Sequence, residues 1–283
     1  IGILRAWIDQ GAKWPDDAVV ADDPKRSHWA WQPVRHISPP PVARRDWPRT
    51  TVDPFILAKL EAAQLSPTAE ADQATLVRRL YFSLLGLPPT PEEVAEFIAD
   101  RRLDAYDALV DRLLDSPHFG ERWARHWLDV VRFAESDGFE TNQPRPNAWP
   151  YRDYVIRAFN TDKPYDRFVF EQLAGDSVGV DEATGFLVGG PFDRVKSPDI
   201  VLTLTQRADE LHDMIGTTGT ALLGITVGCA RCHNHKFDPV SQTDYYALRA
   251  VFAGVQHGER PLKPADHDQR VAEAERLRME VAR

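Results

Sequence analysis

Residues 84–98, LLGLPPTPEEVAEFI, contain the end of one helix and the beginning of the next. Gly86, followed by a leucine and two prolines, is typical of a helix C-terminus. Thr90 can accept a hydrogen bond as an N-cap, the proline after it suits the first helical position, and Glu93 completes a capping box. The stretch therefore predicts two helices joined by a short turn.

The same helical pattern continues in both directions along the chain. Apolar residues recur at helical spacing, and convincing alternation of the kind that predicts strands is absent. We expect an all-α fold: an irregular multi-helix domain with long loops, one of them at residues 176–200. The expected helices lie near residues 53–60, 72–84, 90–98, 106–114, 123–130, 154–159 and 168–173, with a short amphipathic helix in residues 1–14.

Composition excludes some classes of partner and of protein. The chain has 283 residues and a formal net charge of −9. A nucleic-acid surface would need a basic face, so we expect no nucleic-acid partner. No apolar run approaches the roughly 20 residues that cross a bilayer, so we expect no transmembrane segment.

The two cysteines of the chain lie in the sequence Cys229-Ala230-Arg231-Cys232-His233. C-x-x-C-H is the attachment signature of c-type haem. Two cysteines three positions apart can reach the two vinyl groups on one porphyrin edge, and the next histidine can bind the iron from below. We predict one haem c, held by Cys229 and Cys232, with His233 as the proximal iron ligand.

Two other interpretations of the motif stay open. A zinc site could use both cysteines with His233 and His235, although structural zinc sites normally combine pairs of ligands from separated segments. A redox dithiol is the other alternative, although such motifs belong to a βαβ context that the sequence lacks.

The sequence contains several candidates for the sixth iron ligand. Neither methionine, Met214 or Met279, is well placed downstream of the motif as a distal ligand. His126 is the candidate distal ligand, because it lies between two tryptophans on an apolar helix stripe; a hydrogen-bonded core histidine is the alternative. His212 and His235 are weaker candidates.

The acidic loop after the His126 helix contains Glu135, Asp137 and Glu140. Three carboxylates could bind calcium or act as acid and base, although the spacing does not match an EF-hand loop. We expect instead a helix end with solvated acids.

Several long motifs resemble the planctomycete cytochrome c-like domain of unknown function, the family with a CARCHxHKFDP haem motif. The matching stretches are LLGLPPTPEE at 84–93, FGERWARHWLD at 119–129, QLAGD at 172–176 and GCARCHNHKFDP at 228–239. The resemblance implies secretion, haem c and a multi-domain parent protein, but no established reaction. His126 and His233 both fall within motifs of the family.

The resemblance also indicates how the chain is divided. We expect residues 1–14 to be the C-terminal tail of a preceding cytochrome c-type domain and 15–50 to be an extended linker. Residues 51–256 form the expected haem domain, and 257–283 lead toward a further domain.

The expected function is electron transfer by a periplasmic or otherwise extracytoplasmic cytochrome, since haem c is attached outside the cytoplasm. The expected partner is a redox protein or an adjacent cytochrome domain. One alternative is a haem-dependent oxidoreductase or peroxidase, linked to the breakdown of complex carbohydrates. The other alternative is a zinc-binding or non-catalytic scaffold module.

Overall fold

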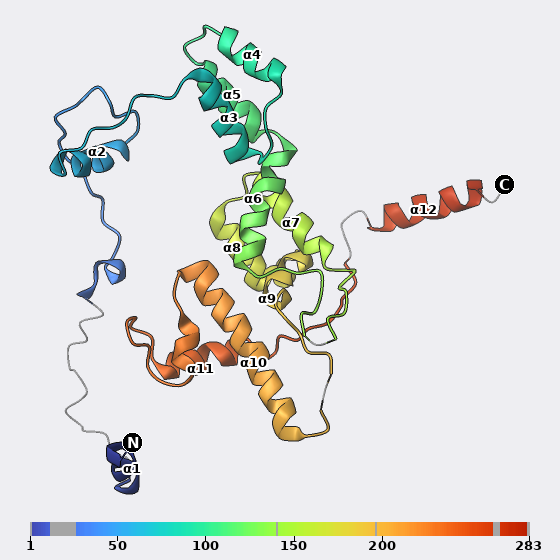
Figure 1. Cartoon of the computed structure of the whole chain (residues 1–283). Coiled ribbons are helices and arrows are strands. Elements are labelled where there is room, and N and C mark those ends of the chain that lie inside the picture. Colours follow the sequence, from blue (N-terminus) through green and yellow to red (C-terminus); the bar gives the residue numbers. More distant parts are fainter. Residues whose placement is uncertain (1, 12–26, 140, 196, 263–266, 282–283) are drawn as a thin grey trace. The chain divides into compact units, whose positions relative to one another are not determined.

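The structure, a computed structural model, describes residues 2–11, 27–139, 141–195, 197–262 and 267–281. The described residues form helices and connecting segments, with one isolated antiparallel bridge between Ser136 and Pro144 and no strand among them. The expected all-α fold is confirmed (Figure 1). Residues 15–26 of the expected linker lie outside the described residues.

The chain divides into two compact units. The first comprises Ile1–Glu70 and Asn234–Ser241, and the second comprises Ala71–His233 and Gln242–Arg283. The first unit contains α1 (Gly2–Asp9), the 3₁₀ turn η3 (Trp29–Trp31) and α2 (Asp53–Ala62).

Helix α2 of the first unit is stabilised by hydrogen bonds at its N-terminus and by one buried leucine. The Asp53 carboxylate accepts hydrogen bonds from the backbone N–H groups of Arg49 and Thr50, both at 2.7 Å. These bonds lower the pKa of Asp53 and fix the turn that leads into the helix. Leu57, only 1% exposed, anchors the helix.

The second unit begins with the helices that the opening motif predicts. They are α3 (Gln73–Leu84), α4 (Pro91–Ala99) and α5 (Ala105–Leu114). Both bonds of the expected capping box are present: the Thr90 hydroxyl accepts from the Glu93 N–H, and the Glu93 carboxylate accepts from the Thr90 N–H. The buried core shared by these helices consists of Val77, Tyr81, Leu109 and Leu113.

The middle of the second unit is an aromatic core. It is formed by α6 (Pro117–Val130), α7 (Trp149–Asn160), α8 (Tyr165–Ala174), η4 (Gly175–Val178), η5 (Asp181–Thr184) and α9 (Gly185–Val188). The expected loop at 176–200 is therefore wrong for its first half, which forms the last three of these short helices. The buried Gln172 side-chain oxygen accepts hydrogen bonds from Trp127 at 2.9 Å and from Tyr151 at 2.6 Å. This buried amide oxygen is thus satisfied, and it joins three helices.

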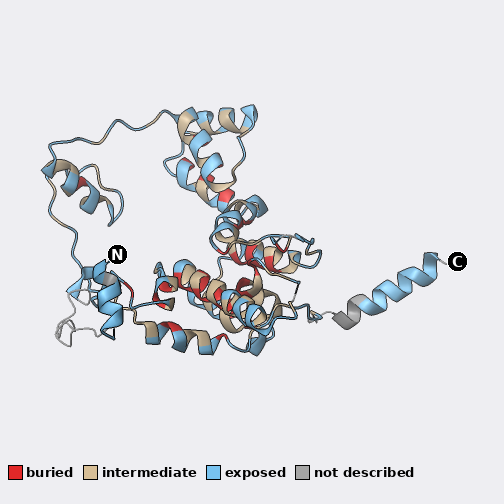
Figure 2. Cartoon of the chain, turned by 60° about the horizontal axis from the view of Figure 1, so that its bottom comes forward, coloured by how far each residue is buried: buried red, intermediate tan, exposed pale blue. Residues whose placement is uncertain are grey.

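The C-terminal part of the second unit carries the cysteine motif. It contains α10 (Ile200–Thr218), the π-helical turn η6 (Gly219–Leu223), η7 (Val227–Arg231), α11 (Gln242–Val251) and α12 (His267–Val281). Buried residues gather in the helices that pack together, whereas α1 and α12 are almost free of them (Figure 2). In the described part of the chain, no helix combines the length and the apolar character that a membrane span requires.

Candidate cofactor site

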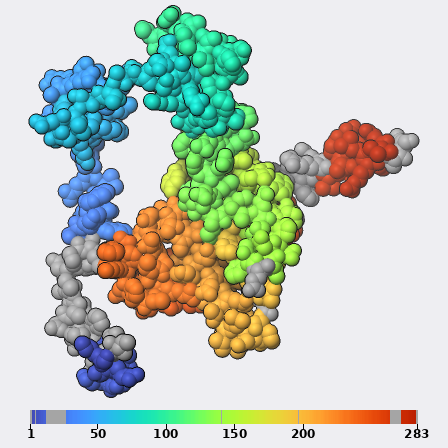
Figure 3. Space-filling model, in the orientation of Figure 1, coloured from blue at the N-terminus to red at the C-terminus, as the bar shows by residue number. Residues whose placement is uncertain are grey.

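The sequence Val227–His233, here called the attachment turn, presents both cysteines to solvent. Val227 and Ala230 are buried, at 5% and 0% exposure, and hold the turn against the rest of the unit. Cys229 and Cys232 are exposed free thiols, and His233 is exposed beside them. The orange part of the chain in Figure 3, which contains this segment, forms part of the molecular surface. Both sulfurs are therefore accessible to a cofactor.

Helices α10 and α11 hold the attachment turn in place. Arg231, between the two cysteines, forms an ion pair with Asp209 of α10 at 2.7 Å. Its backbone carbonyl accepts hydrogen bonds from Gln242 at 3.2 Å and from the Tyr246 hydroxyl at 3.4 Å, both on α11. Contacts with α10 and α11 thus hold Arg231, between the two cysteines, in place before any cofactor binds.

His212 of α10 is the histidine that lies against this turn. Its Nδ1 and the Tyr245 hydroxyl are 3.0 Å apart. A Cβ atom added to Gly228 would lie only 3.0 Å from the His212 Cε1. The glycine therefore allows the histidine ring to approach the turn closely. Burial, and next the positive charge of Arg231, lower the pKa of His212 and favour the neutral imidazole.

His235 belongs to a different local structure, the Asn234–Ser241 loop of the first unit. It is 4% exposed, and its Nδ1 accepts the backbone N–H groups of Phe237 at 3.2 Å and Asp238 at 2.7 Å. The ring therefore shapes its own loop. Within the described ranges, no three side chains of His, Cys, Asp or Glu are grouped closely enough to hold a metal ion.

His126, the candidate distal ligand, lies exposed on α6. Its ring centroid is 5.4 Å from that of Trp123, which is 37% exposed. The other flanking residue, Trp127, instead belongs to the aromatic core. Helix α6 packs chiefly on α7, whereas η7 packs on α10 and α11. The structure thus brings His212 against the attachment turn, whereas His126 lies on a helix that packs chiefly on α7.

The acidic loop differs from the sequence expectation at Asp137. This residue is completely buried, and its carboxylate binds Arg145 at 2.7 Å and also Arg194. Burial raises its pKa, but bonding to the two guanidinium groups outweighs burial, and the net pKa is lowered. The expectation of solvated acids was wrong at Asp137, because Arg145, eight residues on, and the distant Arg194 compensate its buried charge.

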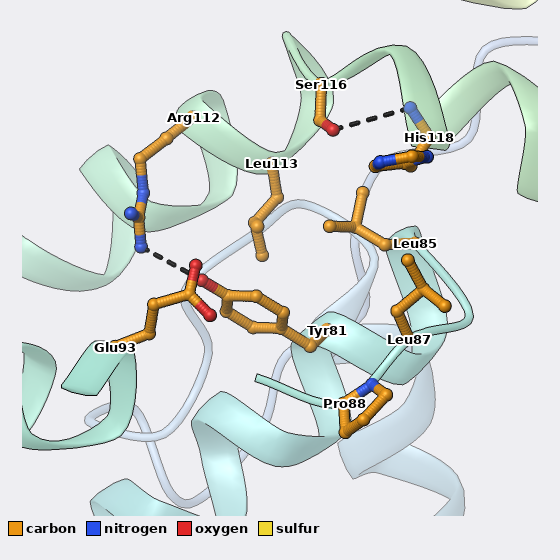
Figure 4. Close-up of a pocket in the computed structure, with 9 residues that line it drawn as sticks. All are labelled: Tyr81, Leu85, Leu87, Pro88, Glu93, Arg112, Leu113, Ser116 and His118. Atoms are coloured by element: carbon orange, nitrogen blue, oxygen red, sulfur yellow. Dashed lines mark hydrogen bonds between the residues drawn. The ribbon is translucent and has the colours of Figure 1, made fainter. Parts of the chain in front are cut away.

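A separate pocket of about 290 Å³ lies between α3, α4 and the α5–α6 junction (Figure 4). Tyr81 accepts a hydrogen bond from Arg112 at 3.2 Å, and burial followed by bonding to Glu93 raises its pKa to about 12. These polar groups bind one another, so the pocket is explained by packing of the first three helices of the second unit.

No curated protein and no solved structure matches the chain. Residues 51–257 match the family model described as PSCyt2, protein of unknown function (DUF1549). That segment contains the attachment turn and every helix that packs on it. Because the match covers well over half of the sequence, the chain belongs to this family.

Proposed function

We propose that this domain is a c-type cytochrome module that carries electrons through one covalent haem. Cys229 and Cys232 would form the two thioether bonds, and His233 would be the proximal ligand of the iron. The observation that supports this most directly is the attachment turn, where two free thiols and an imidazole are exposed on a turn whose other side is buried.

The donor set fits haem c better than it fits zinc. A structural zinc site needs four converging ligands, usually from two separated segments. Here the Nδ1 of His235 already accepts two backbone N–H groups within its own loop, which fixes the ring in that loop. The haem, when bound, supplies the one-electron chemistry, and the protein supplies attachment, axial ligation and burial of one porphyrin face.

An extracytoplasmic location belongs to the same proposal, because haem c is attached outside the cytoplasm. A redox protein, or an adjacent cytochrome domain of the same protein, would exchange electrons with the site. If no side chain occupies the sixth coordination position, the same site would favour haem-dependent oxidoreductase chemistry.

The experiment is a pyridine haemochrome spectrum of the chain exported to a periplasm that contains c-type maturation enzymes. We expect a c-type band that survives acid-acetone extraction in the wild-type chain. The variant with Cys229→Ala and Cys232→Ala is the control and should lack the band. A wild-type chain without covalent haem would overturn the proposal, and metal analysis of the same sample would then test zinc.

A further inference from the structure

One face of α11 runs alongside the attachment turn. Gln242, Tyr246 and Arg249 lie at helical spacing that places them on one side of the helix. The first two bind the carbonyl of Arg231, at 3.2 and 3.4 Å. Arg249 lies further along, about 10 Å from Gln242 at 1.5 Å of rise per residue. The face therefore begins at Arg231, between the two cysteines, and leads away from it.

Tyr246 is the aromatic part of this face. The residue is 45% exposed, so part of the ring lies open beside the turn. The guanidinium carbon of Arg249 is 5.8 Å from the ring centroid, within the range of a cation–π interaction. An exposed aromatic ring and a cation are thus neighbours, and the ring's hydroxyl reaches the residue that lies between the two cysteines.

Arg249 differs from the other arginines of this region in its partners. Arg231 pairs with Asp209 at 2.7 Å, and Arg207 pairs with Glu210 at 2.9 Å. For Arg249, no ion pair with a carboxylate is found among the residues that the structure describes. Its positive charge is therefore available to an anionic group from outside the protein.

We propose that Tyr246 packs against the porphyrin and that Arg249 pairs with a haem propionate; this inference rests on the proposed haem attachment. The thioether bonds fix the vinyl edge of haem at the cysteines, so its two propionates lie on the edge remote from them. Guanidinium groups bind carboxylates through paired hydrogen bonds. Arg249 lies toward the far end of the α11 face, and its guanidinium group would hold such a carboxylate there.

Chemical modification of arginine tests the contact without any measurement of activity. The haem-loaded chain and the haem-free Cys229→Ala, Cys232→Ala chain are treated with phenylglyoxal, and modified arginines are located by mass spectrometry. We expect Arg249 to react in the haem-free chain and to lose most of its reactivity in the haem-loaded chain.

Arg78 is the matched internal control. It stacks over Phe82 at 4.7 Å, in the three-helix part of the second unit, and should react equally in both chains. Equal reactivity of Arg249 in both chains would overturn the inference while leaving haem attachment intact. Absence of covalent haem from the wild-type chain would overturn both, and the haemochrome spectrum reveals that case first.

The reduction potential provides a second readout. Arg249→Gln removes a positive charge near the iron and should lower the potential, because the ferric state gains relative stability. Arg249→Lys should restore part of the shift, and Arg78→Gln should cause none. Covalent haem should be retained in all three variants. An unchanged potential in Arg249→Gln would contradict the assignment.

Discussion

At the scale of single residues, burial acts strongly on the pKa of His257. Its ring stacks on Phe192, with centroids 4.3 Å apart, and both ring nitrogens are buried without a hydrogen-bond partner in the described structure. Burial lowers its pKa to about 4; Arg145 and Arg207 act in the same direction, whereas Glu210 and Asp213 oppose it. The folded protein therefore holds this imidazole neutral.

This shift predicts a loss of stability in mild acid. Unfolded histidine takes up a proton near pH 6.5, whereas folded His257 does so only near pH 4. The stability of the folded state is therefore unaffected by this histidine above about pH 6.5, and it falls as the pH is lowered toward 4. At pH 5 we expect a loss of about 1 kcal/mol, after allowing for solvent screening of a partly exposed ring.

Urea unfolding at pH 7.5 and pH 5 measures this loss. His257→Phe keeps an aromatic ring on Phe192 but cannot take up a proton, so it should remove about 1 kcal/mol from the pH dependence. His36→Phe changes an exposed histidine elsewhere and serves as control. If His257→Phe and the wild type show the same pH dependence, His257 is not the group responsible.

A second prediction at the residue scale concerns the sixth iron ligand. If His126 is that ligand, His126→Ala should keep covalent haem but change the ferric spectrum from low spin to high spin. His118→Ala is the control, since His118 lies on the same helix and pairs with Glu121 at 2.8 Å. Absorption and electron paramagnetic resonance spectra distinguish the two states.

The competing histidine is His212, which contacts the attachment turn. A low-spin spectrum in His126→Ala together with a high-spin spectrum in His212→Ala would transfer the role to His212. High-spin iron in the unmutated protein would indicate an open position and would favour oxidoreductase chemistry over electron transfer.

At the scale of elements, helices with strong capping signals were predictable, and the longest helix was not. The sequence of Asp53-Pro54 predicted the start of α2, Asp72 that of α3 and Thr90 that of α4. Helix α10 begins with IVLTLT, residues 200–205, where β-branched residues weaken the helical signal. Packing of its C-terminal half, through Leu211, Met214 and Ile215, outweighs that local preference.

The candidate site, too, could be predicted only in part from the sequence. The C-x-x-C-H spacing predicted which residues would hold a haem, because that pattern is local. The residues that fix the attachment turn, such as Asp209 and Tyr246, come from helices on either side of the motif. No local pattern marks them, since their role depends on how α10 and α11 pack. Buried Asp137 was missed for the same reason.

The N-cap of α10 provides a prediction at this scale. The Asp199 carboxylate accepts hydrogen bonds from the N–H groups of Val201 at 2.8 Å and Leu202 at 3.4 Å. Loss of such a cap typically costs about 1 kcal/mol. We therefore expect Asp199→Ala to lower the free energy of unfolding by about that amount, as measured in urea, and Asp199→Asn to retain most of it. Equal loss in both variants would show that charge, rather than capping, matters.

At the scale of the whole molecule, the described buried residues of the second unit lie in several groups of packed helices. One core lies among α3, α4 and α5, and another is the aromatic cluster around Trp127 and Gln172. Buried Ile215 and Tyr245 belong to α10 and α11, the two helices that pack on η7 and so support the attachment turn. An apolar cofactor placed over these helices would bury further apolar surface and should contribute measurably to stability.

This predicts that haem attachment stabilises the folded chain. A covalent haem is present in the folded and unfolded states alike, so only the porphyrin surface that becomes buried on folding counts. The Cys229→Ala, Cys232→Ala chain should therefore melt at a lower temperature than the haem-loaded chain. The thiols are exposed, so the substitutions themselves should cost little.

The wild-type chain made without haem-attachment enzymes separates these two effects. It retains both cysteines and lacks haem, so in a reducing buffer it should melt at the same temperature as the double alanine variant. If the haem-loaded and haem-free wild-type chains also melt together, the haem buries no porphyrin surface against the protein. The contact assigned to Tyr246 would then be excluded, while covalent attachment through Cys229 and Cys232 could still carry electrons at the surface.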